Sequence, residues 1–524
     1  MIKLIPAPKQ VKELNGTFLI KKDDLTVKTD FPLPLLKLQR GDNALLIIEK
    51  NNNLKAEGYM LEVNEKKIKI SACDEAGAYY ALQSLRQISR YELCERRVPC
   101  CKISDEPRYK WRGLQLDESR HFFGKDSVKK LLDNMFMMKL NVFHWHLTDD
   151  QGWRIEIKKY PLLTEIGSVR KSTHINGWGS TQIVYGVHKG YYTQEDIREI
   201  VDYAAQRNIM IVPEIDFPAH CAAAIAAYPW LACRELKRDV PGYFGSSIPE
   251  KVMKIKDWNR TICAGKKKTV QFVFDVIDEV CEMFPGEYFH IGGDEAPKDE
   301  WKKCPNCQKT MKENNLKNEE ELQGYFNNLI LEHLKKKGKR LIGWNEILKA
   351  KNLDNSVVAQ YWTPKKDNNA RNHAQKGLNI IMSNHKSFYF DIPFAQYPLK
   401  NTYCFKPEEY GINGSQKSVM GVEGENWTEW TNSLEKLEMK LHPRMEALAE
   451  SAWSDEAVKD WNDFKERIES FKSYYDYLGI NYAVSKIYQP SGLFNRTKIK
   501  KLFFNGDTDY EFNMNEKYRR EGLR

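Results

Sequence analysis

Two patterns of hydrophobic and polar residues divide the chain near residue 107. Before this point, alternating apolar and polar positions at Tyr59–Val63 and Lys67–Ile70 predict strands, and the pattern of Glu75–Arg90 predicts an amphipathic helix. The rhythm changes after Ser104–Pro107, where we place a domain boundary. We therefore expect residues 1–106 to form a small α+β domain.

After Tyr109, short apolar runs alternate with helical patterns, which is typical of βα units stacked around a parallel sheet. Eight runs are predicted to be strands: Trp111–Leu116, Val142–Leu147, Met210–Ile215, Tyr288–Ile291, Leu341–Trp344, Val357–Trp362, Ile380–Ser383 and Val419–Glu423. Helical patterns lie between most of them: Asp126–Lys139, Gln194–Arg207, Thr269–Met283, Glu319–Lys337 and Asn369–Lys376. This order predicts an α/β fold, a (β/α)8 TIM barrel with long loops, over residues 107–480.

The alternative to a barrel is a doubly wound open sheet, but no GxGxxG motif follows an early strand. After the last predicted strand, His442–Trp453 and Asp460–Leu478 have helical patterns. Residues 481–524 are expected to form a polar, basic C-terminal tail with a short apolar patch at Leu502–Phe504.

The composition is that of an ordinary globular protein. Hydrophobic residues make up 41% and charged residues 29% of the 524 residues, which excludes collagen-like and wholly disordered chains. No apolar run of about 18 residues occurs, so no segment is expected to span a membrane. The net charge of +9 comes from lysines and arginines that are mostly spread out. We therefore expect a solvated basic surface and no nucleic-acid partner.

The 11 cysteines are odd in number and irregularly spaced, which argues against a disulfide framework. Cys304 and Cys307 form the one CxxC with a metal-like spacing. A structural zinc would need a second pair or a Cys/His set, and none follows at a suitable distance. We expect an ordinary loop here, with a local disulfide as the alternative.

Polar and aromatic side chains gather at the predicted carboxyl ends of the barrel strands, where enzymes of this fold carry their active sites. In chain order they are Asp117, Arg120, His121, His144, His146, Asp149, Asp150, Glu214, Asp216, His220, His290, Asp294, Glu295, Trp344, Glu346, Trp362, Tyr389, Asp391, Trp427 and Glu429. A single residue of this kind usually has a structural role, but the repetition indicates a site. Tryptophans beside acidic residues suit a sugar, which offers an apolar face and hydroxyl groups.

The strongest local signal is the segment HIGGDE at residues 290–295. Adjacent side chains of an extended chain point to opposite faces, so Asp294 and Glu295 can reach one pocket only if the chain turns sharply. Gly292 and Gly293 permit such a turn. Taken alone, the segment could equally be an acidic loop that caps a helix.

With its surroundings, this segment resembles glycoside hydrolase family 20, the β-N-acetylhexosaminidases. The resemblance extends from Trp111 to about Trp453 and rests on these motifs: WRGLQLDESRHFF, NVFHWHLTDDQGWR, VPEIDFPAH, HIGGDE, GWNEI, YWTP, YFD and GENWTE. The preceding region is similar to the small α+β domain that usually comes before this barrel. Ala219 replaces the usual glycine of FPAH, and Asn345 replaces a common acidic residue of GWNEI. Neither change removes a group with a chemical role.

The resemblance implies an exo-acting glycoside hydrolase that removes terminal non-reducing β-linked GlcNAc or GalNAc with retention of configuration. Most glycosidases use two carboxylates, but in this family the 2-acetamido oxygen of the substrate attacks and forms an oxazolinium intermediate. By match, Glu295 is the general acid and Asp294, expected to be ionised, stabilises the acetamido nitrogen. Tyr389 donates its hydroxyl proton to the acetamido oxygen.

The resemblance also implies which residues bind the sugar or orient the general acid. They are Arg120 for the outer hydroxyls, Trp344, Trp362 and Trp427 around the acetamido group, Asp149 and His220 behind Glu295, and Asp391 and Glu429 for further hydroxyls. No cofactor and no metal are implied, and the partner is an oligosaccharide or glycoconjugate with terminal β-HexNAc. Sugar preference, linkage and oligomeric state stay open.

Two alternatives belong to other functional classes. The pair His144 and His146 at a strand end is also how metal-dependent amidohydrolases begin a binuclear site, although there the pair ends the first strand and here it falls on the second. The other alternative is a glycan-binding protein without catalysis, against which the presence of both Asp294 and Glu295 argues.

The first residues, MIKLIPAPKQVKELNG, lack the apolar core and cleavage site of a signal peptide. Families of this type mostly meet their substrates outside the cytoplasm. We therefore expect an exported protein, periplasmic, cell-surface or extracellular, whose leader is absent from this chain; a cytoplasmic protein is the alternative.

Overall fold

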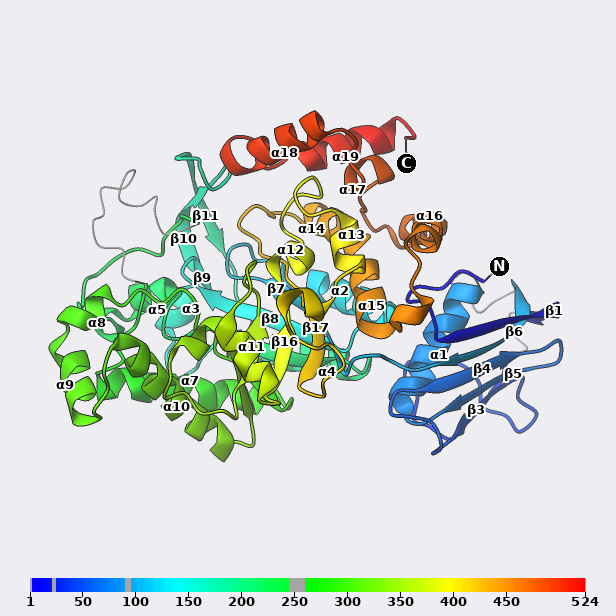
Figure 1. The fold of residues 1–524 in the computed structure, drawn as a ribbon, viewed down its shortest axis with the longest axis horizontal. Helices are drawn as coiled ribbons and strands as arrows, with labels where there is room; N and C mark the ends of the chain where they lie inside the picture. Colours follow the sequence, from blue (N-terminus) through cyan, green and yellow to red (C-terminus); the bar gives the residue numbers. More distant parts are fainter. Residues whose placement is uncertain (1, 21–24, 90–95, 245–259, 524) are drawn as a thin grey trace.

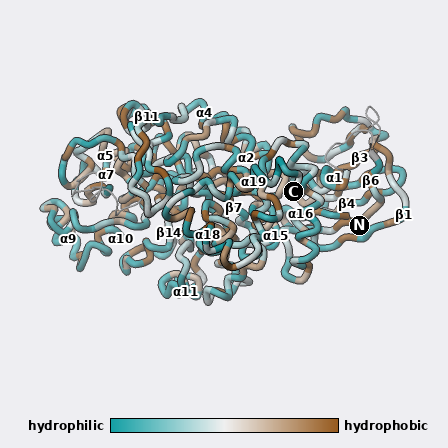
Figure 2. The backbone as a smooth tube through the Cα atoms, turned by 90° about the horizontal axis from the view of Figure 1, so that it is seen from above, coloured by the Kyte–Doolittle hydropathy of each residue, from teal (hydrophilic) through white to brown (hydrophobic). Residues whose placement is uncertain are grey.

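The molecule has two main parts that lie side by side. The computed structural model describes residues 2–20, 25–89, 96–244 and 260–523. Figure 1 shows a small sheet domain at one end, a barrel in the middle and the C-terminal helices along one side of the barrel. Figure 2, viewed at right angles, shows the same arrangement, with hydrophobic stretches distributed through both parts.

The N-terminal part is a six-stranded sheet with one helix. Its strands are β1 (Gln10–Ile20), β2 (Val27–Thr29), β3 (Leu46–Lys50), β4 (Tyr59–Val63), β5 (Ile68–Ala72) and β6 (Arg96–Asp105), hydrogen-bonded in the order β1–β6–β4–β5–β3–β2. Helix α1 (Glu75–Ile88) packs on β4 and β5. It begins at Asp74, whose carboxylate accepts a hydrogen bond from the Gly77 N–H at 2.8 Å. Arg90, the last residue predicted for this helix, lies outside the described residues.

The barrel consists of eight parallel strands, which confirms the predicted (β/α)8 fold. They are β7 (Trp111–Asp117), β8 (Val142–Asp149), β12 (Met210–Ile215), β13 (Tyr288–His290), β14 (Arg340–Trp344), β15 (Val358–Tyr361), β16 (Ile380–Met382) and β17 (Val419–Gly424). Each strand pairs with the next in this order, and β17 pairs with β7 to close the barrel. All eight predicted strands lie close to their predicted limits.

Helices surround the barrel, and the five that were predicted between strands are confirmed. The longer ones are α2 (Lys125–Met137), α4 (Gln194–Ala205), α7 (Lys267–Met283), α10 (Glu319–Lys336), α11 (Asn368–Gln375), α14 (Leu434–Leu441) and α15 (Arg444–Trp453). Shorter elements interrupt the loops: β9 (Gly152–Trp153), α3 (Leu162–Glu165), the hairpin β10 (Val169–His174) and β11 (Ile183–Lys189), α5 (Ala222–Ala227), η1 (Pro229–Leu231), α8 (Asp299–Lys303), α9 (Pro305–Glu313), η2 (Asn345–Lys349), α12 (His385–Phe388), α13 (Leu399–Tyr403), η3 (Pro407–Tyr410) and η4 (Glu456–Val458).

The C-terminal tail is helical, which its sequence pattern did not predict. After α16 (Trp461–Leu478) the chain forms α17 (Ser485–Tyr488), α18 (Leu493–Asn505) and α19 (Tyr510–Arg520). These helices contact the rest of the molecule through few side chains. Ile499, Phe503 and Asn515 are buried, whereas Leu493 and Phe494 are exposed. The apolar face is therefore too narrow to give a clear helical period.

The two parts are joined by a buried polar cluster around Asp105, at the end of β6. Its carboxylate pairs with Lys139 Nζ at 3.0 Å and accepts hydrogen bonds from Tyr59 Oη at 2.8 Å and Trp453 Nε1 at 2.9 Å. Lys139 and Trp453 belong to the barrel part, so a carboxylate of the sheet neutralises a buried ammonium of the barrel.

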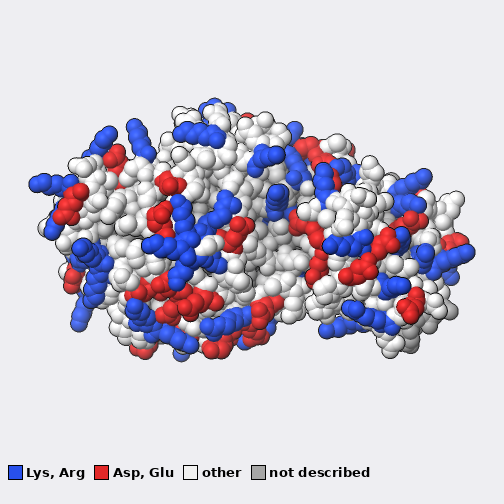
Figure 3. Space-filling model, turned by 90° about the horizontal axis from the view of Figure 1, so that it is seen from below, with Lys and Arg blue, Asp and Glu red and all other residues white. Residues whose placement is uncertain are grey.

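The surface carries both signs of charge. On the face shown in Figure 3, Lys and Arg are interspersed with Asp and Glu over both parts, as expected for a solvated surface. In the described part of the chain, no helix combines the length and the apolar character needed to cross a bilayer.

Candidate active site

Strand alternation builds the site in layers, because every second side chain of a barrel strand points inward. The lowest layer is an apolar cluster of Trp111, Val142, Val212, Tyr288, Ile342, Val358 and Ile381. Two positions later, inward side chains are polar, as at Glu214 after Val212 and Gln360 after Val358. Two positions later again, Asp216 and Trp362 reach a pocket at the carboxyl ends of the strands.

His144 and His146 belong to the buried polar layer and pair with carboxylates. His144 Nδ1 lies 2.7 Å from Glu423 Oε1, and its Nε2 lies 3.1 Å from Glu214 Oε2. Burial opposes charge on this ring, but the two carboxylates raise the pKa of His144 to about 10. His146 is likewise held between Glu214 and Asp149. The histidine pair is therefore part of a buried ion-pair network beneath the pocket.

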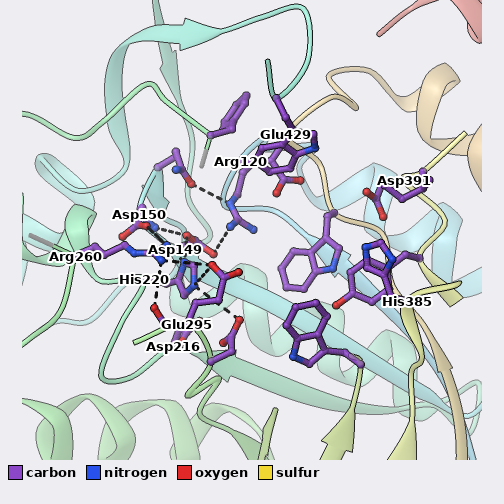
Figure 4. Close-up of a pocket in the computed structure, with 18 of the residues that line it drawn as sticks. Arg120, Asp149, Asp150, Asp216, His220, Arg260, Glu295, His385, Asp391 and Glu429 are labelled. Carbon is purple, nitrogen blue, oxygen red and sulfur yellow. Dashed lines mark hydrogen bonds and ion pairs between the residues drawn. The ribbon is translucent and has the colours of Figure 1, made fainter. Parts of the chain in front are cut away.

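The pocket has a volume of about 400 Å³. It is lined by Arg120, Asp149, Asp150, Gln151, Trp178, Asp216, His220, Phe244, Arg260, Asp294, Glu295, Trp362, His385, Tyr389, Asp391, Ile392, Trp427, Glu429 and Phe504. Figure 4 shows Asp149, His220 and Glu295 together on one side, with His385 and Asp391 on the opposite side. The residues that the resemblance implies for catalysis or sugar binding all line this pocket except Trp344. Of the other strand-end candidates, these do not line it: Asp117, His121, His144, His146, Glu214, His290 and Glu346.

The turn after β13 brings Asp294 and Glu295 to the same pocket. Gly292 and Gly293 have positive φ angles of 64° and 92°, which glycine adopts without a steric penalty. The Gly293 N–H donates to Asp216 Oδ1 at 3.2 Å, and a Cβ on Gly292 would lie 2.1 Å from the same oxygen. Glu295 itself has a φ of 42°, an uncommon conformation for a residue with a side chain. The predicted sharp turn is present.

Asp294 has a buried carboxylate oxygen, Oδ1, without a hydrogen-bond partner among the described residues. Burial raises the pKa of Asp294 to about 7, and the neighbouring Glu295 adds to this effect while His220 opposes it. With a pKa near 7 Asp294 is partly protonated at neutral pH, so its expected ionised form beside the positive charge of the reacting substrate stays a prediction. An unpartnered acceptor that lines a pocket is suited to an N–H group of a ligand.

His220 lies between two acidic residues, Asp149 and Asp150, and the Asp294–Glu295 pair. Its Nδ1 is 3.1 Å from Asp149 Oδ1, and its Nε2 is 3.8 Å from both Asp294 Oδ2 and Glu295 Oε2. Burial opposes a charged ring, but Asp149 raises the pKa of His220 well above its usual value. His220 therefore presents a cation to both acidic side chains, in the place that the resemblance implies for it.

Arg260 is a second cation beside Glu295, and no pattern in the sequence pointed to it. Its Nη2 donates to the Glu295 backbone oxygen at 3.2 Å and to Oε2 at 3.4 Å, and its Nη1 lies 3.6 Å from Asp150 Oδ2. It stands in a loop without helical or strand periodicity. A lone arginine in such a loop cannot be distinguished from a surface arginine without the fold.

Arg120 is fixed by three polar contacts. It lies 2.8 Å from Asp149 and 3.2 Å from Asp117, and its Nε donates to Gln151 at 2.9 Å. The guanidinium is 5.2 Å from the centre of the Trp427 ring.

Asp149, Asp216 and His220 also lie close enough together to be candidate ligands of a metal ion. In the structure Asp149 pairs with Arg120 and with His220, so these residues form an ion-pair network.

Three aromatic side chains form one wall of the pocket. Tyr389 lies 6.0 Å from Trp362, with the rings nearly parallel, and 6.3 Å from Trp427. His385, which the sequence analysis missed, packs on Tyr389 at 4.3 Å between ring centres. Such a wall is suited to an apolar group, and the Tyr389 hydroxyl adds a hydrogen-bond donor.

Trp344 and Asn345 support this wall from behind. Trp344 is 1% exposed, donates from Nε1 to Glu214 at 2.8 Å and lies 5.9 Å from the Trp427 ring. It does not line the empty pocket, so its assignment to the acetamido wall stays a prediction. Asn345, one of the two departures from the family motifs, accepts a hydrogen bond from the Trp362 N–H at 3.1 Å.

Asp391 and Glu429 place acidic groups opposite the Asp294–Glu295 pair. Burial raises the pKa of Asp391 to about 8, with Glu429 adding to it. Burial also raises the pKa of Glu429, although Arg120 opposes the shift. Asp391 Oδ1 has no hydrogen-bond partner in the part of the chain that the structure describes. Both groups can therefore accept or donate hydrogen bonds to hydroxyl groups.

The rim of the pocket comes from distant parts of the chain. Trp178 lies in the loop between β10 and β11, Phe244 lies in the loop after η1, and Phe504 belongs to α18. The Gly179 N–H donates to the Phe504 backbone oxygen at 2.8 Å, so the tail is attached to the β10–β11 loop. None of the three was predicted, although Phe504 falls in the apolar patch noted in the tail.

Comparisons with known proteins agree with this geometry. The family model "Glycosyl hydrolase family 20, catalytic domain" matches residues 109–456, and "Glycosyl hydrolase family 20, domain 2" matches residues 23–106. A protein from Porphyromonas gingivalis (strain ATCC BAA-308 / W83) named Beta-hexosaminidase is 38% identical over 534 residues. That alignment covers 94% of this chain, which spans only 65% of the relative's length.

Solved structures of family 20 enzymes are also similar to this chain. The β-N-acetylhexosaminidase from Bacteroides fragilis NCTC 9343 superposes with a TM-score of 0.79 at 30% identity, covering 94% of this chain and 99% of that one. The GH20 exo β-N-acetylglucosaminidase from Vibrio harveyi, solved with N-acetylglucosamine, gives a TM-score of 0.80 at 30% identity, covering 92% and 78%. Because the two family models together match residues 23–106 and 109–456 and these structures share the fold at 30% identity, the chain belongs to glycosyl hydrolase family 20.

Proposed function

We propose that the protein is an exo-acting β-N-acetylhexosaminidase that removes terminal, non-reducing β-linked GlcNAc or GalNAc by a retaining, substrate-assisted mechanism. The observation that carries the proposal is the adjacency of Asp294 and Glu295 at one pocket, with Asp294 Oδ1 unpartnered. Of two neighbouring carboxyl groups, one can accept a hydrogen bond from the acetamido nitrogen while the other protonates the glycosidic oxygen.

In the first step, the acetamido oxygen of the substrate attacks the anomeric carbon and the bond to the glycosidic oxygen breaks. Glu295 gives its proton to the departing oxygen, so the aglycone leaves as a neutral alcohol. Asp294 accepts a hydrogen bond from the acetamido N–H and stabilises the positive charge of the oxazolinium ring. Tyr389 donates to the acetamido oxygen and, with Trp362 and Trp427, holds the group in its attacking position.

In the second step, water attacks the anomeric carbon from the face that the aglycone left. Glu295, now a carboxylate, takes a proton from this water, and the oxazolinium ring opens to restore the acetamido group. Two displacements at one carbon give overall retention. His220 Nε2 and Arg260 Nη2 lie 3.8 Å and 3.4 Å from Glu295 Oε2, where both can orient the carboxyl group for the two proton transfers.

The shape of the site supports an exo-acting enzyme. The pocket is of a size for a terminal sugar and has polar side chains on several sides: Arg120, Asp391 and Glu429 among them. The Vibrio harveyi relative is itself described as an exo β-N-acetylglucosaminidase.

The experiment that tests the proposal is a series of aryl β-GlcNAc substrates with one, two or three fluorine atoms on the N-acetyl group. Fluorine withdraws electrons from the attacking oxygen, so kcat/KM should fall steeply along the series. Proton NMR should show the β-anomer as the first product. A flat response, a first product that is the α-anomer, or a glycosyl-enzyme adduct on any carboxylate would overturn the mechanism.

The same aryl glycosides test the general acid. In Glu295→Gln, kcat should fall by about 10²–10⁴-fold for poor leaving groups and less for activated ones that need no proton. The matched control is Glu300→Gln, a nearby acidic residue in α8 that does not line the pocket. An equal loss for all leaving groups in Glu295→Gln would show that Glu295 is not the acid.

A further inference from the structure

Four cysteines from three separate segments meet beside the loop that carries Glu295. Cys233 follows η1, Cys263 lies in the next described loop, and Cys304 and Cys307 stand at the beginning of α9. All four are free thiols, and all but the half-buried Cys233 are buried. The expectation of an ordinary CxxC loop therefore needs correction: the second pair precedes the motif in the chain and does not follow it.

The distances between the sulfur atoms are those of a tetrahedral metal site. Sγ of Cys263 lies 3.5 Å from that of Cys307 and 3.7 Å from that of Cys304, and Sγ of Cys233 lies 3.8 Å from that of Cys307. A zinc–sulfur bond of about 2.3 Å gives a sulfur–sulfur edge of about 3.8 Å in a regular tetrahedron. A disulfide bond needs about 2.05 Å.

The surrounding backbone holds the sulfur atoms in place. Ala232 and Ile262 form an antiparallel bridge, and the Cys263 N–H donates to the Leu231 oxygen at 2.7 Å, so the segments that carry Cys233 and Cys263 are held side by side. The Gly265 N–H donates a hydrogen bond to the Cys263 sulfur. A Cβ on Gly265 would lie 2.4 Å from the Cys307 backbone nitrogen, so only glycine permits these two segments to approach so closely. Backbone amides near sulfur and close glycine contacts support thiolate ligands.

We propose that Cys233, Cys263, Cys304 and Cys307 bind one structural Zn²⁺ ion. Four thiolates in a tetrahedron are the ligand set of structural zinc sites, which have no open position for substrate. The spacing alone does not predict this set, because Cys233 and Cys263 are far apart in the chain and only the fold brings them to the CxxC pair.

The site is connected to the pocket through the segment that contains Arg260. The Ile262 N–H donates to the Pro218 oxygen at 2.9 Å, and the Cys221 N–H donates to the Arg260 oxygen at 3.0 Å, so residues 260–263 are bound to the His220 loop. Arg260 contacts Glu295. The ion therefore has a positioning role: it fixes the segment that holds Arg260 against the general acid.

The test is elemental analysis of the purified 524-residue chain after dialysis against metal-free buffer. We expect one zinc per chain, and loss of zinc together with a Tm lower by several degrees or more in Cys263→Ser. The matched control is Cys281→Ser, a half-buried free cysteine of α7 outside the cluster, which should keep its zinc. Cobalt substitution should give thiolate charge-transfer and tetrahedral d–d bands that Cys263→Ser lacks.

If Cys263→Ser does not fold, the native chain still decides the question. Mass spectrometry after alkylation should show these four thiols protected until a strong chelator is added, and reactive afterwards. Two disulfides among the four cysteines, iron in place of zinc, or thiols that react fully without a chelator would each overturn the proposal. Zinc that persists in Cys263→Ser would also overturn it.

Discussion

Several carboxyl groups of the pocket are held where burial opposes their charge. Asp294 has a pKa of about 7 and Asp391 of about 8, both mainly because of burial. A free carboxyl group titrates at about 4, so each of these groups binds a proton more tightly in the folded chain than in the unfolded one. Their ionisation therefore destabilises the fold, and a positive charge on a bound ligand would relieve this cost.

For this reason Asp294→Asn should stabilise the fold while abolishing most activity. The wild-type chain loses stability relative to the variant as pH rises from about 4 to about 7, because Asp294 then gives up a proton that the native state prefers to keep. The gain in unfolding free energy should grow over this range and level off above it, at about 1–4 kcal/mol. Denaturant unfolding at pH 5 and pH 8 measures it.

Asp299→Asn is the control for this prediction, because Asp299 lies on the exposed surface of α8 with 82% of its side chain accessible. Its unfolding free energy should change little at either pH. If the two variants respond alike to pH, burial of Asp294 does not oppose its ionisation.

At the scale of elements, the turn after β13 decides whether the two acidic side chains meet. In Gly292→Ala the new Cβ would lie 2.1 Å from Asp216 Oδ1, so the turn must shift and carry Asp294 and Glu295 with it. We expect a loss of kcat of at least tenfold and a decrease in unfolding free energy of about 2 kcal/mol or more.

Gly338→Ala separates the steric effect from the backbone effect. Gly338 has a φ of 70°, close to the 64° of Gly292, but nothing lies within 4 Å of a Cβ built on it. It should lose only about 1 kcal/mol, the cost of the left-handed conformation, and keep its activity. Equal losses in the two variants, measured by unfolding and steady-state kinetics, would contradict the role of the Asp216 contact.

The barrel was predictable because each strand is a short apolar run bounded by polar residues, as at Met210–Ile215, where the predicted and observed limits coincide. The site residues that directly follow strands were found by the same logic. Arg260, His385 and Trp178 were not, because they stand in loops or short helices whose positions depend on tertiary contacts. The cysteine cluster was missed for a related reason: its ligands are far apart in the chain and only the fold brings them together.

At the scale of the whole molecule, the Asp105 cluster connects the N-terminal sheet to the barrel. In Asp105→Asn the ammonium group of Lys139 stays buried without a counter-charge, which should lower the unfolding free energy by about 3–5 kcal/mol. The deficit should shrink as pH rises, because burial already lowers the pKa of Lys139 and deprotonation removes the unpaired charge.

The neighbouring residue provides the control. Glu106 pairs with Lys9 and Lys55 at the surface, where an ion pair contributes about 0–1 kcal/mol, so Glu106→Gln should be nearly neutral. Thermal and denaturant unfolding of both variants measure the difference. A loss in Asp105→Asn no larger than that in Glu106→Gln would show that the cluster does not stabilise the junction.

The attachment of α18 to the β10–β11 loop has a consequence for how the enzyme can evolve. Asp294 and Glu295 stand in the turn that follows barrel strand β13, whereas Trp178 and Phe504 at the rim stand in the β10–β11 loop and in the tail. For the proposed hexosaminidase, mutations at the rim can change which neighbouring sugars are accommodated without altering the Asp294–Glu295 pair. Within this one chain, selection for a new glycan and selection for catalytic rate can therefore act on different segments.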